Sequence, residues 1–554
     1  MESRSKPGLV AGPRTLFHVN GTGQNRLAFR LVLLVLLITP LACSGGFAYP
    51  AELTATALST QQVISGAELE QSIIEETPDP VETPYLNPTP GSNSPLAASP
   101  DPASTPTPRP TPEIPILYYT QAGDTLKGIS ARFNVDPSEI FSPDLEELPE
   151  EGLFDPDVLL IIPPRLGETS NDTRLIPDSE VVNSPSALDL DLPAFIKAGG
   201  GYLSTYQEWR VSGFAGWHDG ASIIERVSLE NSINPRLLLA ILEHQSHWVY
   251  GQPQNLAQTD YPIGYIDGEK NRKHLYFQLA WAVEQLNIGY YHWRDGSLVE
   301  LNFRNGEKLR LAPNLNAGTV AVLYLYSRLY NQQEWADKLY GPEGLMTVYE
   351  KMFGNPWIRA QSVEPLFPAT ITQPPMELPY LPGRSWALTG GPHPAWGPNG
   401  AKAALDFAPA STVHGCYKSD EWVTAIASGM VVRSETGVVV LDTDGDGHEQ
   451  TGWVILYLHI ATEDRVPLGT WVDLNGRIGH PSCEGGTATG THVHIARKYN
   501  GEWILADGPI PFVLSGWRAH AGSKDYEGML TNGDSVVYAS QVGSFESVVT
   551  RPRQ

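Results

Sequence analysis

The spacing of apolar residues changes along the chain. Between residues 195 and 360, apolar positions recur with helical spacing in three stretches, at 235–251, 277–293 and 317–331. Between 383 and 520, valine-rich runs alternate with glycine turns, as at 422–426, 430–433, 438–441 and 453–459. The first pattern predicts α-helices and the second predicts antiparallel strands. We therefore expect an α-helical domain over 191–360 and an antiparallel all-β domain over 383–520.

A shorter unit, 116–165, precedes these domains. Tyr118-Tyr119-Thr120 predicts a strand, and Gly123-Asp124 predicts a turn ahead of a helix whose apolar positions include Leu126 and Phe133. A second helix is expected to begin near Val135, and 158–163 predicts a closing strand. The expected fold class of this unit is therefore small α+β, in the order βααβ.

Proline-containing polar stretches separate the predicted units. Residues 44–115 are rich in proline, threonine and serine, and such a run forms an extended spacer because it cannot form a core. Residues 166–190 and 361–382 predict two further linkers, and 521–554 predict a C-terminal extension.

The N-terminus has the pattern of an export signal. Arg26 and Arg30 precede the apolar run 31–41, which is short for a membrane span but suits the apolar core of a signal peptide. Leu41-Ala42-Cys43 resembles a bacterial lipoprotein cleavage site, although Pro40 departs from the pattern. Residues 1–43 therefore predict a signal peptide or lipoprotein anchor, with an uncleaved anchor as the alternative. The chain is expected in the cell envelope, anchored to the membrane through a lipid on Cys43, or secreted.

Charge and cysteine content narrow the function. A net charge of −25 argues against binding nucleic acid. Of the three cysteines, Cys416 and Cys483 both lie in the β domain, where export favours a disulfide between them. Two buried thiols are the alternative. Neither cysteine lies in a CxxC motif, so neither is a good candidate zinc ligand.

Four histidines and one aspartate in the β domain predict a hydrolytic zinc site: His393, Asp406, His459, His492 and His494. In a strand, His492 and His494 would project from the same face. Catalytic zinc sites use three protein ligands of the histidine or carboxylate type. The set supplies three such ligands, with two groups left for proton transfer.

The motifs that carry these residues are "GGPH", "ALDFA", "YLHIA" and "GTATGTHVHIAR". In this order they resemble the lysostaphin-like zinc endopeptidases, most closely the β-lytic branch, which has the wide spacing between the first histidine and the aspartate. The resemblance implies that His393, Asp406 and His494 bind zinc and that His459 and His492 form the catalytic pair. Which histidine of the pair accepts and which donates a proton stays open.

Two upstream segments also resemble known modules. "YYTQAGDTLKGISARFNVDPSEI" and "LLIIPP" resemble the LysM module, which binds glycans that contain N-acetylglucosamine. This resemblance implies glycan contacts from Gly123, Asp124, Thr125 and Leu126.

The order of helices over 191–360 resembles lysozyme-like lytic transglycosylases, whose catalytic glutamate precedes a serine. Here Gln245 precedes Ser246, and an amide cannot protonate a leaving sugar oxygen. Glu243 would point to another side of the helix, so this domain is expected to be non-catalytic.

Three carboxylates alternate in a glycine-containing loop, at Asp442, Asp444 and Asp446. A calcium loop begins in this way, because calcium prefers several oxygen ligands. The EF-hand register would need an acid at Trp453, so a plain acidic turn is the alternative.

Taken together, the sequence predicts an exported zinc endopeptidase that cleaves amide bonds in the peptide stems or cross-bridges of peptidoglycan. The LysM-like module would target it to the cell wall. A catalytically silent wall-binding or amidase-activating protein is the main alternative. A bifunctional enzyme with glycosidase activity through Glu243 is the third.

Overall fold

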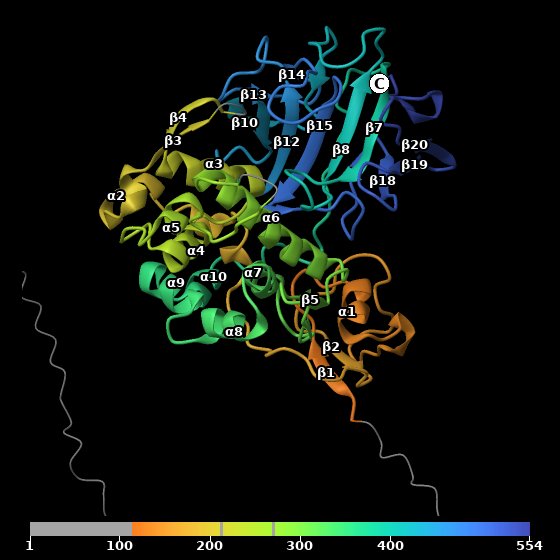
Figure 1. The fold of residues 1–554 in the computed structure, drawn as a ribbon. Coiled ribbons are helices and arrows are strands. Elements are labelled where there is room, and N and C mark those ends of the chain that lie inside the picture. The colour runs from red at the N-terminus through yellow and green to blue at the C-terminus, as the bar shows by residue number, and fades with distance from the viewer. Residues whose placement is uncertain (1–113, 211–213, 269–271, 554) are drawn as a thin grey trace, which may run out of the picture. The chain divides into compact units, whose positions relative to one another are not determined.

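The computed structural model describes residues 114–210, 214–268 and 272–553 (Figure 1). The expected signal peptide or lipid anchor at 1–43, and nearly all of the expected spacer at 44–115, lie outside the described residues. Among the helices that the structure describes, none is both long and apolar enough to cross a membrane.

Residues 116–162 form the first small unit. Strand β1 (Ile116–Tyr119) pairs antiparallel with β2 (Leu159–Ile162), and helix α1 (Leu126–Phe133) lies between them in sequence. The Thr125 side chain caps α1 by accepting a hydrogen bond from the Gly128 amide. The prediction of a second helix in this unit is wrong. Only a 3-10 turn forms, at Pro137–Glu139, and the backbone is extended again at Ile140.

Helices dominate the region from 192 to 360. The three predicted helices are confirmed as α4 (Pro235–Ser246), α6 (Leu275–Arg294) and α7 (Ala317–Ser327). The others are α2 (Leu192–Gly199), α3 (Gly220–Asn231), α5 (Leu256–Asp260), α8 (Gln332–Tyr340), α9 (Leu345–Phe353) and α10 (Pro356–Ala360). Two hairpins also occur there, β3 (Gln207–Arg210) with β4 (Gly216–Asp219), and β5 (Glu300–Asn302) with β6 (Lys308–Arg310).

Helices α6 and α7 approach each other closely at a glycine. A Cβ atom added at Gly289 would lie 2.6 Å from the Cα atom of Ala321 and 2.9 Å from the Tyr324 Cβ atom. Only a residue without a side chain fits there, so Gly289 sets the distance between the two helices.

An antiparallel nine-stranded sheet forms most of the C-terminal region, as predicted (Figure 1). Its strand order is β13-β10-β11-β12-β15-β8-β7-β21, with β16 also paired to β15. The strands are β7 (Ser385–His393), β8 (Ala404–Pro409), β10 (Gly429–Glu435), β11 (Gly437–Asp442), β12 (Trp453–Ile460), β13 (Trp471–Val472), β15 (Val493–Tyr499), β16 (Glu502–Trp503) and β21 (Val548–Thr550). Smaller sheets hold β9 (Val423–Thr424) with β14 (Arg477–Gly479), and β17 (Val513–Leu514), β18 (Trp517–Ala521), β19 (Gly528–Asn532) and β20 (Ser535–Tyr538).

The two faces of the large sheet belong to different hydrophobic cores. Along β12, Ile455 and Tyr457 lie in a core formed by the β region alone. Leu456 and Leu458 project from the opposite face into a core that they share with the helical region. Because side chains alternate along a strand, this second face also carries Ala496 and, two residues earlier, His494.

The stretches expected as linkers contribute to these cores. Ile176 and Val181 are buried with the helices, and so are Leu366 and Phe367. Leu378 and Tyr380 are buried in the core of the β region, as is Val549 near the C-terminus. The apolar residues inside these polar stretches therefore hold the stretches against the neighbouring folded parts.

Arg294, the last residue of α6, joins three parts of the described chain. Its guanidinium donates to the Ala122 carbonyl beside α1. It also lies 2.9 Å from a carboxylate oxygen of Asp178 and 3.2 Å from one of Glu502 in β16. All three side chains are mostly buried, so the cation neutralises two carboxylates away from bulk water.

Candidate metal centre

The three predicted ligands come from adjacent strands. His393 ends β7, Asp406 lies in β8 and His494 lies in β15. Asp406 pairs directly with His494 across β8 and β15, and with Gly390 across β7 and β8. The antiparallel register therefore brings together side chains that are up to 101 residues apart in sequence.

The candidate ligand atoms form a nearly equilateral triangle. His393 Nε2 lies 3.0 Å from His494 Nδ1 and 3.3 Å from Asp406 Oδ1, and His494 Nδ1 lies 3.2 Å from the same oxygen. Tetrahedral zinc, with bonds of about 2.0–2.1 Å, separates its ligands by about 3.3 Å. Asp406 Oδ1 is also buried, and it has no hydrogen-bond partner among the residues that the structure describes. The residues therefore fit a zinc ion in donor type, spacing and unmet bonding capacity.

Backbone carbonyls set the tautomers of both candidate ligand histidines. His393 Nδ1 donates to the Gly391 carbonyl at 2.8 Å, and His494 Nε2 donates to the Ala395 carbonyl at 3.0 Å. A neutral imidazole that donates from one nitrogen keeps a lone pair on the other. Each ring therefore turns its lone pair toward Asp406, and such outer hydrogen bonds hold metal-binding histidines in place.

His459 and His492 lie beside this triangle, with ring centroids 4.5 Å apart. Their Nδ1 atoms donate to the carbonyls of Glu484 and Gly490, at 2.9 and 2.7 Å. Both therefore keep a lone pair on Nε2, and in His492 this atom lies 3.7 Å from Asp406 Oδ2. His459 has a φ of 65°, an uncommon backbone conformation for a histidine. All five predicted residues thus lie together in one site.

Burial and mutual charge shift the acidities of the site. Burial alone would raise the pKa of Asp406, but His393 and His492 hold this pKa well below its usual range. Burial also opposes protonation of His393, yet the Asp406 carboxylate outweighs it and raises the pKa of His393. Burial, together with His492 and His494, lowers the pKa of His459 to about 3. The carboxylate is therefore ionised, as a metal ligand must be, and His459 is neutral at physiological pH.

Sequence reasoning missed two residues of the site. Tyr526 stacks on His393, with ring centroids 4.2 Å apart, and comes from the β18–β19 connection, outside the predicted domain. Gly390 lies against Asp406, where an added Cβ atom would come within 2.6 Å of Oδ2. Gly390 belongs to the "GGPH" motif and could have been found there. Tyr526 has no motif signal.

The predicted glycan-binding loop has structural partners. Asp124 is buried, where it pairs with Arg132 and accepts a hydrogen bond from the Tyr118 hydroxyl. Leu126 is buried, and Gly123 lies against the Arg294 guanidinium, which an added Cβ atom would meet at 1.8 Å. In this structure the loop therefore packs on the helical region, and glycan binding by its residues stays a prediction.

Glu243 is also held by local structure. One of its carboxylate oxygens accepts hydrogen bonds from the backbone amides of Val249 and Tyr250. Gln245, at the position expected for a catalytic acid, accepts a hydrogen bond from the Tyr330 hydroxyl at 2.6 Å. Glu243 thus caps the chain that follows α4.

The remaining predicted residues also lie near one another. Asp442, Asp444 and Asp446 bring one carboxylate oxygen each within 4.8 Å of the others, but their carboxylates also accept backbone N–H groups of the same loop. Calcium binding there stays a prediction. The predicted disulfide between Cys416 and Cys483 is confirmed.

Two histidines and one carboxylate, with two further histidines beside them, are side chains of the types that metal-dependent hydrolases use. Comparisons with known proteins show similarity to a protease. Residues 174–366 match the family described as LasA, N-terminal domain. The protease LasA of Pseudomonas aeruginosa is 25% identical over 326 residues, which are 56% of this chain and 72% of the relative.

Two further similarities cover smaller shares of the chain. The β-lytic metalloendopeptidase of Achromobacter lyticus is 28% identical over 160 residues, 27% of this chain and 40% of the relative. The solved structure of pseudoalterin, a metalloprotease from the deep sea, is 22% identical with a TM-score of 0.25, covering 31% of this chain and 96% of that one. The sequence similarities support a metallopeptidase of the LasA and β-lytic type.

Proposed function

We propose that the protein is an exported zinc endopeptidase that cleaves amide bonds in the peptide stems or cross-bridges of peptidoglycan. The observation that carries the proposal is the triangle formed by His393, Asp406 and His494, beside His459 and His492, whose Nδ1 atoms donate to backbone carbonyls. The substrate class rests on the likeness of the four site motifs to lysostaphin-like endopeptidases. Export rests on the N-terminal pattern, with lipid attachment at Cys43 as its membrane-anchored form.

The chain's own residues divide the work. His393, Asp406 and His494 would hold the zinc ion, which would supply Lewis acidity toward the substrate carbonyl and toward water. His459 and His492 each present a bare Nε2, so either can accept a proton from water and return it to the leaving amine.

Wall targeting by residues 116–165 is part of the proposal, and it rests on the likeness to LysM. Since the first loop of this unit packs on Arg294, glycan would have to bind elsewhere on the unit or displace this contact. A pull-down of the full chain with purified peptidoglycan, compared with an Arg294→Lys variant, measures whether the contact limits binding.

Digestion of purified peptidoglycan by the zinc-loaded full chain tests the activity. Mass spectrometry should find new amino and carboxyl termini within the peptides and no new reducing sugar ends. His492→Ala should keep the zinc and lose at least 100-fold in kcat, because proton transfer contributes about 10²–10⁴-fold to catalysis. Binding to the wall without any cleavage would favour a silent wall-binding protein, and new sugar ends that vanish in Glu243→Gln would favour the glycosidase.

A further inference from the structure

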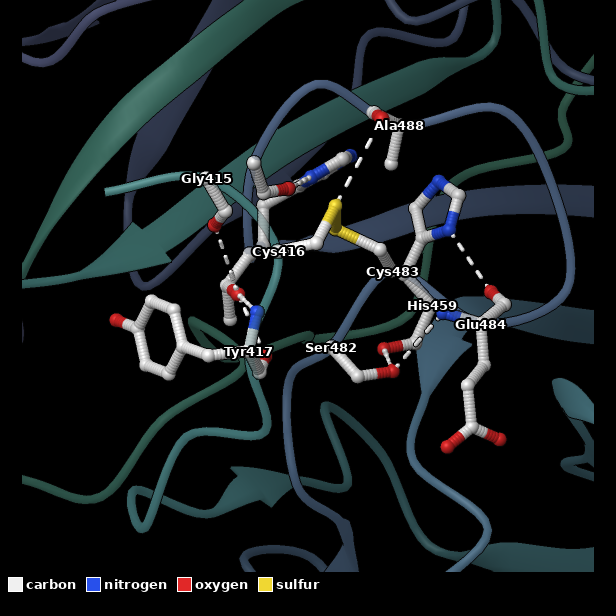
Figure 2. Close-up of a disulfide and its surroundings, with 11 residues drawn as sticks. Gly415, Cys416, Tyr417, His459, Ser482, Cys483, Glu484 and Ala488 are labelled. Atoms are coloured by element: carbon white, nitrogen blue, oxygen red, sulfur yellow. Dashed lines mark hydrogen bonds between the residues drawn. A yellow bond between two sulfur atoms is a disulfide. The ribbon is translucent and has the colours of Figure 1, made fainter. Parts of the chain in front are cut away.

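The disulfide lies within the segment that holds His459: Cys483 stands between Ser482 and Glu484, and both of these residues are hydrogen-bonded to His459. Cys416 follows β8, and Cys483 is the second residue of a loop, 482–491, that directly precedes His492. Figure 2 shows the two cysteines with the neighbouring Ser482 and Glu484. We name 482–491 the bridged loop. Apart from one isolated β-bridge, this loop forms no helix or strand. It contains three glycines, at 485, 486 and 490. Such a loop has high conformational freedom unless something fixes it.

The bridged loop supplies the carbonyls that orient His459 and His492. Glu484 accepts the Nδ1 proton of His459, and Gly490 accepts that of His492. The Ser482 amide and hydroxyl both donate to the His459 carbonyl, which fixes the backbone beside the same ring (Figure 2). His459 and His492 therefore depend on the bridged loop for their tautomers and for the orientation of their rings.

The candidate ligands depend on other segments. The outer nitrogens of His393 and His494 donate to Gly391 and Ala395, which lie outside the bridged loop. Asp406 lies in the interior of the sheet between β7 and β15. A disturbance of the bridged loop should therefore reach the proton-handling histidines and leave the metal-binding triangle intact.

Contacts on two sides hold the bridged loop in place. The disulfide ties it to the segment at 415–417, where the Thr491 hydroxyl also donates to the Tyr417 carbonyl at 2.6 Å. On the other side, the Glu484 carboxylate accepts hydrogen bonds from the amide and hydroxyl of Thr462. The disulfide is the covalent one of these attachments, and Cys416 is exposed to solvent.

We propose that the Cys416–Cys483 disulfide is a positioning element of the peptidase: it holds the bridged loop so that Glu484 and Gly490 keep His459 and His492 in their Nδ1–H tautomers. The proposal rests on the proposed function for the role of these histidines. In this proposal the disulfide supports proton transfer and has no role in metal binding.

The zinc-loaded full chain carrying Cys416→Ser and Cys483→Ser tests the role in catalysis. We expect kcat on peptidoglycan to fall at least tenfold, because misplacing a reacting group by about 1 Å can cost about 100-fold. KM should change less than twofold, and one zinc ion per chain should remain. Cys43→Ser, which removes the third cysteine and keeps the bridge, is the matched control. An unchanged kcat, or a loss of zinc in parallel with activity, would overturn the proposal.

A spectroscopic measurement tests the positioning without reference to activity. In full chain labelled with ¹⁵N-histidine, the ring nitrogens of His459 and His492 should show the Nδ1–H tautomer and lose it in the double serine variant. The signals of His393 and His494 should stay unchanged. If the tautomers change in this way but the wild-type chain cleaves no peptide, the proposed function fails and the positioning stands.

Reduction of the folded wild-type protein gives a second route if the serine variant does not fold. The exposed Cys416 allows tris(2-carboxyethyl)phosphine to reach the bridge, with excess zinc present. Activity and tautomer signals should be lost together and return on reoxidation. Full activity with free thiols demonstrated by labelling would refute the positioning role.

Discussion

At the scale of single residues, Asp406 decides whether the site can hold a metal. Its Oδ1 atom is buried between two histidine nitrogens, and no described residue donates a hydrogen bond to it. Burying an ionised carboxylate in this position costs free energy unless a cation binds to it. The two histidines that flank it turn lone pairs toward the same point, and so they cannot supply the missing proton in their neutral forms.

Asp406→Asn should therefore abolish tight zinc binding. The amide keeps the size of the side chain but removes its charge and gives the buried position an N–H donor. We expect at least tenfold weaker zinc affinity and loss of peptide cleavage in a folded protein. Metal analysis after dialysis measures this. Asp446→Asn, in the exposed carboxylate cluster, should keep its zinc; equal zinc loss in both variants would argue against the assigned site.

Glu364 gives a residue-level prediction about pH. Burial and the nearby Asp178 raise the pKa of Glu364 from 4.5 to about 7, while Ser179 and Arg294 oppose the rise. The folded protein therefore binds this proton more tightly than the unfolded chain. Its contribution to stability is complete below pH 4.5 and is lost as the pH rises through 7.

Glu364→Gln should remove this dependence. The variant should be more stable than the wild type at pH 8, by at most about 3 kcal/mol at 1.36 kcal/mol for each pKa unit. At pH 4 the two should be equal. Unfolding midpoints measured across this range check the prediction, and a variant that is less stable at pH 8 would contradict it.

At the scale of elements, periodicity predicted the long helices and the strands but missed what local chemistry decides. Helix α4 and strand β12 follow runs that are apolar over several turns or positions, so burial and local preference agree. After Phe133 the pattern suggested another helix, but Asp136 caps only one turn before the chain extends. The weak strand β21 pairs with β7 at the sheet edge, a long-range contact that its own three residues do not specify.

The contact between α6 and α7 gives a prediction at this scale. Gly289→Ala would gain about 1 kcal/mol of helix propensity. The added methyl group would, however, collide with the backbone of α7, and overpacking costs about 1–3 kcal/mol. We expect a net loss of up to about 2 kcal/mol in the free energy of unfolding, measured in urea. Gly167→Ala, where no atom lies within 4 Å of the added carbon, should be neutral.

At the scale of the whole molecule, the sequence predicted the order of the parts and the five site residues but not how the parts join. The site residues carry motifs, whereas their orienting partners are backbone carbonyls at Gly391, Ala395, Glu484 and Gly490, which any residue type could supply. Arg294 lacks a motif too, yet it contacts three parts of the chain. Such contacts depend on the tertiary fold and leave no local pattern.

Arg294→Met should therefore weaken the joined structure as a whole. It would leave the buried carboxylates of Asp178 and Glu502 without their cation, and breaking a buried ion pair from one side costs about 3–5 kcal/mol. Thermal unfolding should shift to lower temperature. Adding Glu502→Gln to the Arg294→Met variant should recover part of the lost stability. The second substitution removes a buried carboxylate that has lost its cation. Purely additive effects would show that the two side chains act independently.

If the protein is an exported peptidase as proposed, the disulfide between Cys416 and Cys483 has a consequence for when its activity would begin. A chain that is still in the compartment where it is made would meet reducing conditions. These conditions would keep Cys416 and Cys483 as free thiols. Under the positioning proposal, such a chain could fold and take up metal while its proton-transfer groups remained misdirected. Oxidation outside the cell would then complete it, so the producing cell would carry the peptidase in a slow form until the enzyme had left.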